Sequence, residues 1–256
     1  MIGRGALAVL ALVLFLVAQA PASWVAERIR ALGGDRLRLI NVAGSVWSGR
    51  GDLWFHDPDS RGGTPWKTIR WDFEAGGLAR GELRWRLRSG EESGCVLFLT
   101  GGRQGVRDLA WLLPAGPVLA WLPGLAGRLG WSGELLLTVV DWNCDLAGTA
   151  CRGNGHLLWQ GAASALLPLP AAGDYGIQAR ADGQQIELSW STLSGKLQTR
   201  GQVRLDGAEV RGEGWISGPP EQLAGLPTIA DRWVQATATP GHYRLRFADR
   251  ATGIDR

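Results

Sequence analysis

The stretch Gly81-Glu-Leu-Arg-Trp-Arg-Leu-Arg88 decides the fold class. Every second residue in it is apolar, which places Leu83, Trp85 and Leu87 on one face of an extended chain and three arginines on the other. A strict period of two is typical of a β-strand, whereas a helix would repeat its apolar residues every three or four positions. This stretch is therefore predicted to be a strand with one buried face.

The same alternation recurs on both sides of this strand. Just upstream, Ile69, Trp71 and Phe73 alternate with charged residues, and similar patterns follow at 186–190, 197–205, 210–216 and 243–247. Glycine-containing turns fall roughly every 8–12 residues, the spacing expected of antiparallel sheets. We therefore predict a mainly β body over residues 37–250, folded as a curled meander, a groove or a sandwich.

Two segments do not alternate and are predicted to be short helices. Residues 106–129 contain the apolar stretches 108–114 and 117–123, which have proline boundaries, and residues 219–225 begin with two prolines. A helix lying on an open sheet would cover an apolar face that otherwise contacts water.

The N-terminus carries an uninterrupted apolar run over residues 5–18, preceded by an arginine and followed by small residues. This order is typical of a secretory signal, and small-residue triplets that suit cleavage end at Ala20 and Ala22. The whole segment also approaches the roughly 20 residues that span a membrane, and cleavage after Ala20 would leave a proline at the new N-terminus. We expect residues 1–22 to be an uncleaved anchor, with a cleaved signal as the alternative, and residues 23–36 to be a short linker or helix.

The orientation of this segment follows from two opposing signals. Four arginines lie between residues 28 and 38, and a count of flanking charges alone would place the body in the cytoplasm. Long domains cross membranes largely regardless of charge, and the signal-like order of features favours export. We therefore expect the body to be exported.

The three cysteines are compatible with export. Cys144 and Cys151 flank a turn-like stretch between two strand patterns, so they could face each other as a hairpin disulfide. Cys95 lies in an apolar strand and is predicted to be a small buried hydrophobe. The chain has no Cys-x-x-Cys motif, which excludes a redox or zinc site built on that spacing.

Charge and catalytic motifs exclude several functions. The net charge is +3, and the basic residues, nearly all arginine, are interspersed with acidic ones as on a solvated surface, so nucleic acid is not expected as a partner. Phosphate or lipid headgroups are the alternative that arginine would suit. The three histidines are far apart, and there is neither a Gly-x-Ser-x-Gly elbow nor a phosphate-binding loop. We predict no catalytic, cofactor-binding or metal-binding residues, and no enzyme.

Tryptophan is the commonest aromatic residue, with 14 copies against five phenylalanines and two tyrosines. The triplet Trp-x-Gly occurs at Trp47, Trp131 and Trp159. It could form a tryptophan platform along a groove, or place a core tryptophan beside a glycine bulge where strands approach closely. The candidate interaction or groove residues are Trp47, Trp71, Trp85, Trp131 and Trp159.

Ordered blocks of glycine, tryptophan and leucine carry a family resemblance. The first is Val42-Ala-Gly-Ser-Val-Trp-Ser-Gly-Arg-Gly-Asp-Leu53, and the second is Gly77-Leu-Ala-Arg-Gly-Glu-Leu-Arg-Trp-Arg-Leu87. Further blocks follow in order at 133–137, 155–162, 173–176, 193–201 and 240–245. Over most of residues 37–248 the chain resembles type II secretion system protein N, also called general secretion pathway protein N.

The resemblance implies an accessory, single-pass subunit of the bacterial inner membrane, inserted through residues 2–22 with its C-terminal body in the periplasm. Such a subunit serves the export of folded proteins across the outer membrane. Its expected partners are other secretion subunits, in the inner-membrane platform or the secretin, and it needs no catalytic residues. The strands are also similar to the open β-groove proteins related to the AsmA family, so binding or transfer of lipid is the alternative.

Overall fold

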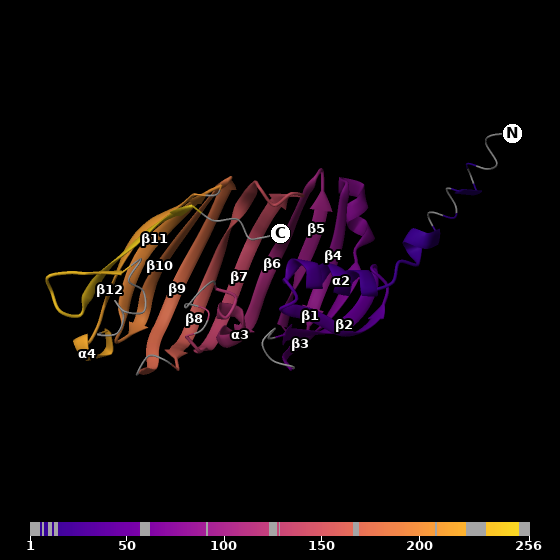
Figure 1. The fold of residues 1–256 in the computed structure, drawn as a ribbon. Coiled ribbons are helices and arrows are strands. Elements are labelled where there is room, and N and C mark those ends of the chain that lie inside the picture. The colour runs from indigo at the N-terminus through magenta and orange to yellow at the C-terminus, as the bar shows by residue number, and fades with distance from the viewer. Residues whose placement is uncertain are drawn as a thin grey trace. The chain divides into compact units, whose positions relative to one another are not determined.

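The computed structural model describes residues 6, 8, 9, 12, 15–56, 62–90, 92–122, 127, 129–165, 169–207, 209–223 and 234–250. The chain divides into two compact units, Met1–Phe98 and Leu99–Arg256. Strands follow one another along the chain from indigo to yellow in Figure 1. The predicted mainly β, antiparallel architecture with a few short helices is confirmed.

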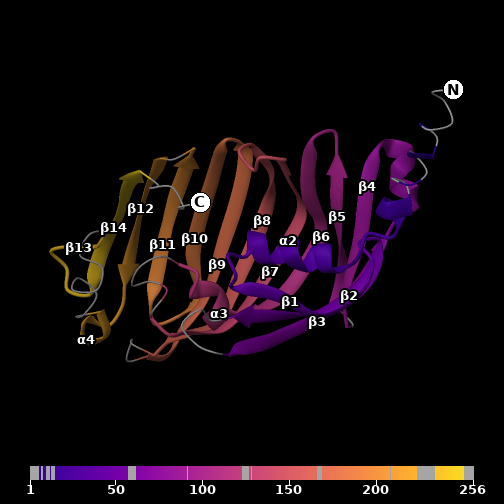
Figure 2. The ribbon, with the colours of Figure 1, turned by 45° about the vertical axis from the view of Figure 1, so that its right-hand side comes forward.

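Among the described residues, unit 1 combines consecutive antiparallel strands with short helices. Its elements are α2 (Ser23–Leu32), β1 (Leu37–Gly44), β2 (Ser48–His56), β3 (Gly63–Phe73), the 3-10 helix η1 (Ala75–Arg80) and β4 (Glu82–Ser89), followed by β5 (Glu92–Thr100), within which the division falls. Helix α2 packs beside β1 (Figure 2).

The alternation in the sequence becomes cross-strand pairing in unit 1. Trp71 lies opposite Leu87, and Phe73 lies opposite Trp85, so the apolar residues of β3 and β4 share one face of the sheet. Buried side chains on β1, β2 and β3 complete the core, namely Leu39, Leu53, Phe55 and Ile69.

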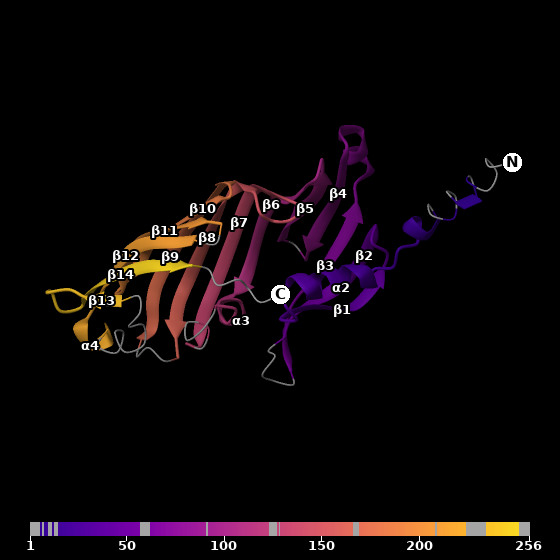
Figure 3. The ribbon, with the colours of Figure 1, turned by 45° about the horizontal axis from the view of Figure 1, so that its top comes forward.

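Unit 2 contains the remaining strands and two short helices. In chain order these are β6 (Arg103–Pro114), α3 (Ala115–Leu119), β7 (Trp131–Asp145), β8 (Cys151–Ser164), β9 (Leu169–Gly183), β10 (Gln185–Gly195), β11 (Gln198–Asp206), β12 (Glu209–Ser217), α4 (Pro220–Leu223), β13 (Val234–Ala236) and β14 (His242–Arg250). Each strand pairs with the next in the sequence up to β12, which pairs with β14, and the short β13 then pairs with the far side of β14 (Figure 3).

The register separates an apolar and a polar face in unit 2, because directly paired residues project to the same side of a sheet. One apolar row crosses β7 to β10 through Leu137, Leu157, Ile177 and Trp190. A row on the opposite face crosses β8 to β12 through Asn154, Arg180, Glu187, Arg204 and Arg211. At one end of the apolar face, Leu223 of α4 joins the buried cluster of Ala162, Tyr175 and Leu197.

The helix predicted at 108–114 is wrong. These residues belong to strand β6, where Leu109, Trp111 and Leu113 alternate and pair with apolar residues of β7. The intervening positions are also rich in apolar residues, which hides the period of two in the sequence. A helix does follow this strand, but α3 spans only Ala115–Leu119.

The N-terminal segment is only partly described. Residues 15–18 are helical, whereas residues 1–5, 7, 10, 11, 13 and 14 of the predicted anchor lie outside the described residues. Among the residues that are described, we find no helix with both the length and the apolar character needed to cross a membrane.

Candidate functional site

The candidate tryptophans fall into two separate aromatic groups, one in each unit. In unit 1, Trp47 stacks on Trp85 with ring centroids 6.2 Å apart and meets the edge of Phe73 at 5.0 Å. Phe73 is the last residue of β3, Trp85 lies in β4, and Trp47 lies in the turn before β2.

Indole N–H groups fix the turn that contains Trp47. The indole of Trp71 donates to the carbonyl of Ser45 at 3.0 Å, and that of Trp85 donates to the carbonyl of Val46 at 3.1 Å. The hydroxyl of Ser45 in turn accepts from the backbone N–H groups of Trp47 and Ser48, both at 3.2 Å. Trp71 is 4% exposed, and its hydrogen bond holds the turn in place from within the core.

In unit 2, Trp159 lies between Trp131 and Tyr175, with centroid distances of 5.3 and 5.9 Å. Its indole donates to the carbonyl of Ser132 at 3.1 Å. Gly133, two residues after Trp131, lies in a bulge with a φ of 106°, which a residue with a side chain rarely adopts. Burial of Tyr175 raises the pKa of its hydroxyl to about 12, and the nearby Asp174 carboxylate contributes a smaller part of this shift.

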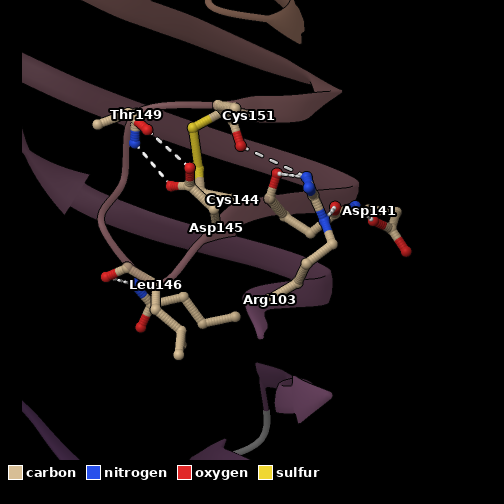
Figure 4. Close-up of a disulfide and its surroundings, with 10 residues drawn as sticks. Arg103, Asp141, Cys144, Asp145, Leu146, Thr149 and Cys151 are labelled. Carbon is tan, nitrogen blue, oxygen red and sulfur yellow. Dashed lines mark hydrogen bonds between the residues drawn. A yellow bond between two sulfur atoms is a disulfide. The ribbon is translucent and has the colours of Figure 1, made fainter. Parts of the chain in front are cut away.

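Cys144 and Cys151 form a disulfide across the paired ends of β7 and β8 (Figure 4). The loop between them is organised by Asp145, whose carboxylate accepts from the hydroxyl and the backbone N–H of Thr149 at 2.6 and 2.7 Å. The hydrogen bond from the Thr149 hydroxyl, followed by that from its backbone N–H, lowers the pKa of Asp145. Arg103 adds a hydrogen bond from its Nε to the side-chain oxygen of Asn143 at 2.8 Å.

Cys95 is 1% exposed, and burial raises the pKa of its thiol to about 11. A thiol with such a pKa is neutral near pH 7 and is a poor nucleophile. Within the described part of the chain, no three His, Cys, Asp or Glu side chains gather closely enough to hold a metal ion.

The polar face of unit 2 is hollowed in two places. The larger hollow, of about 1050 Å³, lies over β9 to β14, and the second, of about 880 Å³, lies over β8 to β12. The first is lined by side chains that include Ser191, Leu193, Arg200, Trp215, His242 and Arg244. It therefore combines exposed apolar surface with guanidinium and hydroxyl groups.

The larger hollow has a distinctive centre. Trp215 is 43% exposed, and it lies directly opposite Arg200 on one neighbouring strand and Arg244 on the other. Arg244 forms an ion pair with Glu213 at 3.1 Å, whereas Arg200 has no acidic partner among the described residues. Sequence reasoning missed this group, although the alternation at 210–216 already placed Trp215 on the face opposite Ile216.

Comparison with known protein families identifies one that matches this chain. Residues 35–230 match the family described as type II secretion system (T2SS), protein N. Neither the curated proteins nor the solved structures contain a match to this chain. The family match spans more than half of the chain, from before β1 to beyond α4, and it includes both aromatic groups, the disulfide and most of the larger hollow. The chain therefore belongs to the type II secretion system protein N family.

Proposed function

We propose that this chain is an accessory subunit of the type II secretion system that acts as a non-enzymatic assembly module. The family match over residues 35–230 carries this proposal, because membership implies a part in the export of folded proteins across the outer membrane. In the proposed arrangement, residues 2–22 anchor the chain in the inner membrane and the body lies in the periplasm.

The disulfide supports the periplasmic part of the proposal. Disulfides persist in oxidising compartments such as the periplasm, whereas the cytosol keeps thiols reduced. Cys144 and Cys151 face each other across a strand pair, so the bond closes without any rearrangement of the sheet. The signal-like order of residues before Ser23 supports the same location.

The larger hollow of unit 2 is the surface that best fits another secretion subunit. Tryptophan and arginine are the residues most enriched among those that dominate binding energy at protein interfaces. Trp215 offers exposed aromatic area, and Arg200 offers a guanidinium without an acidic partner among the described residues. The fitting partner is a segment that brings an apolar side chain and a carboxylate.

An export assay tests this surface in cells. We expect the double change Trp215→Ala and Arg200→Glu to reduce the amount of substrate protein in the medium at least tenfold, because it removes the aromatic area and repels a carboxylate. Arg152→Glu is the matched control, since Arg152 is an exposed arginine of β8 that lines neither hollow. Undiminished export by the double variant, at normal protein levels, would contradict the proposed surface.

A second function, lipid binding, is favoured by the apolar face of unit 2. Half-exposed apolar side chains continue across neighbouring strands, including Ile186, Leu188, Val203 and Leu205. Intact-complex mass spectrometry of the protein released from membranes distinguishes the two functions. Bound phospholipid that is lost in Leu188→Lys would favour lipid binding, whereas lipid-free protein that retains secretion subunits would favour the assembly module.

A further inference from the structure

The residues that end the N-terminal helix are built into the fold of unit 1. Pro21 forms a β-bridge with Ser45, the carbonyl of Ala20 accepts from the N–H of Val46 at 2.9 Å, and the N–H of Ala22 donates to the carbonyl of Gly44 at 3.2 Å. Ala20 and Ala22 are 5% and 3% exposed. We name residues 17–22 together with the turn 44–48 the clasp.

A tryptophan completes the clasp by capping the helix. The carbonyls in the last turn of a helix lack partners within the helix. One of these, the carbonyl of Val17, accepts from the indole N–H of Trp47 at 2.8 Å and from the backbone N–H of Ala20, just past the helix, at 3.2 Å. Because Trp47 is itself packed on Trp85 and Phe73, the end of the helix is tied to the core of β3 and β4.

Large apolar side chains within and beside the clasp are exposed. Phe15, Leu16 and Val17 are 61%, 58% and 48% exposed, and Trp24, just after the clasp, is 63% exposed. The first three belong to the apolar run of residues 5–18, which contains no polar residue. Arg28, one helical turn beyond Trp24 on α2, is also exposed.

We propose that the clasp holds unit 1 against the bilayer surface, with Trp24 and Trp47 at the level of the lipid headgroups. This inference rests on the proposed anchor. If the apolar run that ends at Ala18 lies among the acyl chains of the bilayer, Val17 lies near the end of that run. The indole of Trp47, which donates to the Val17 carbonyl, must then lie at the boundary between the acyl chains and the headgroups. Tryptophan is enriched at that boundary, and an arginine beside it suits lipid phosphate.

The clasp also predicts that residues 17–22 are retained in the mature chain. Cleavage after Ala20 or Ala22 would remove the Val17 and Ala20 carbonyls from the molecule. The indole of Trp47 and the N–H of Val46 would then lose their hydrogen-bond acceptors. The native fold uses atoms that a cleaved chain does not possess.

Depth measurements on the full chain test the proposal. Trp24→Cys and Thr64→Cys, both exposed positions of unit 1, are each labelled with a fluorophore, and the chain is inserted into vesicles of phosphatidylethanolamine and phosphatidylglycerol containing a headgroup nitroxide lipid. Thr64 lies at the opposite end of β3 from Asp72, which pairs with Ser48 of the clasp. We expect quenching at position 24 to be several-fold stronger than at position 64. Equal quenching in a chain that resists alkaline extraction would overturn the clasp orientation while sparing the anchor. Release of the chain by alkali would overturn the anchor itself.

Two further measurements address the clasp directly. Trp47→Phe removes the indole donor but keeps an aromatic ring, and loss of a hydrogen bond worth about 1 kcal/mol should speed amide exchange at Ala22 and Val46 about fivefold. Trp159→Phe removes an equivalent indole-to-carbonyl bond in unit 2 and should leave these amides unchanged. Unchanged exchange in Trp47→Phe, or an intact mass showing a chain that begins at Pro21 or Ser23, would overturn the proposal.

Discussion

At the scale of the residue, Asp174 connects two irregular points of the sheet in unit 2. One carboxylate oxygen accepts from the backbone N–H of Gly161 and the other from the hydroxyl of Ser194, both at 2.8 Å. The pairing of β9 with β8 and with β10 shifts register near these two partners. The hydrogen bond from Gly161, followed by that from Ser194, lowers the pKa of Asp174 below its ordinary value of 3.8.

This lowered pKa predicts how stability depends on pH. A carboxylate with a lower pKa in the folded state stabilises the fold above its unfolded pKa, and this stabilisation is lost as the pH falls through the folded pKa. Asp174→Ala should therefore have a lower Tm than the native protein at pH 7, and the two Tm values should converge below about pH 3.8. Thermal unfolding followed by circular dichroism from pH 7 downwards measures both.

Asp206→Ala is the control for this experiment. Asp206 is exposed on β11, two strands away from β9 in the sheet, and its carboxylate forms no hydrogen bond or ion pair with any described residue. Its substitution should leave the Tm close to that of the native protein at every pH. A Tm difference for Asp174→Ala that stays constant as the pH falls would contradict the assigned role.

The sequence predicts some roles of single residues better than others. Cys95 was expected to be buried, and it is, because a cysteine between strongly apolar strand residues follows their burial. The bonds from Trp71 and Trp85 to the turn at Ser45 and Val46 join residues about 26 and 39 positions apart, and nothing in local periodicity indicates them.

At the scale of the element, Trp190 shows how strands in unit 2 pack closely. Its ring lies over Gly201 of β11 and Gly214 of β12, and a Cβ at Gly201 would overlap the ring. The indole N–H is fixed by the hydroxyl of Thr199 at 3.0 Å, so the ring cannot move aside without losing this bond. Position 201 therefore needs glycine because a larger residue would overlap the Trp190 ring, and not because its backbone conformation excludes other residues.

Gly201→Ala should destabilise unit 2 by about 1–3 kcal/mol through this overlap. Gly176→Ala is the matched control, because a Cβ at Gly176 meets only the Leu193 side chain at an ordinary 3.5 Å. Urea unfolding followed by tryptophan fluorescence measures both variants. Equal stability of the two would show that Trp190 does not occupy this position in solution.

The hairpin between β7 and β8 gives a second prediction for an element. Cys144→Ser combined with Cys151→Ser should lower the free energy of unfolding by about 2–3 kcal/mol, as expected for a disulfide that closes a short loop. Reduction of the native protein should produce the same loss, while the double variant should not respond to reductant. Free thiols at both positions in protein taken from its native cell would contradict the bond.

Elements are predicted from sequence where one face is apolar and the other charged. Strands β4 and β10 to β12 alternate in this way, and their positions were confirmed. Strand β6 was predicted as a helix because apolar residues at Ala110 and Leu112 obscure its alternation. Its identity depends on pairing with β7, which follows α3 and lies beyond the local window of the pattern.

At the scale of the whole molecule, family membership came from the order of weak blocks, and the match over residues 35–230 confirmed it. The larger hollow was not predicted, because it requires strands β11, β12 and β14 to align Arg200, Trp215 and Arg244 in one row. Alternation assigns each of these residues to a face, but only the register places them side by side.

Crosslinking from position 215 in the native cell tests the central claim most directly. A photoreactive amino acid replaces Trp215 in the full chain, and one at Arg152, on the same face but outside both hollows, serves as the control. After irradiation of secreting cells, mass spectrometry identifies the crosslinked molecules. We predict another type II secretion subunit at position 215 and not at position 152. Phospholipid alone at position 215, with no secretion subunit at either position, would contradict the assembly role.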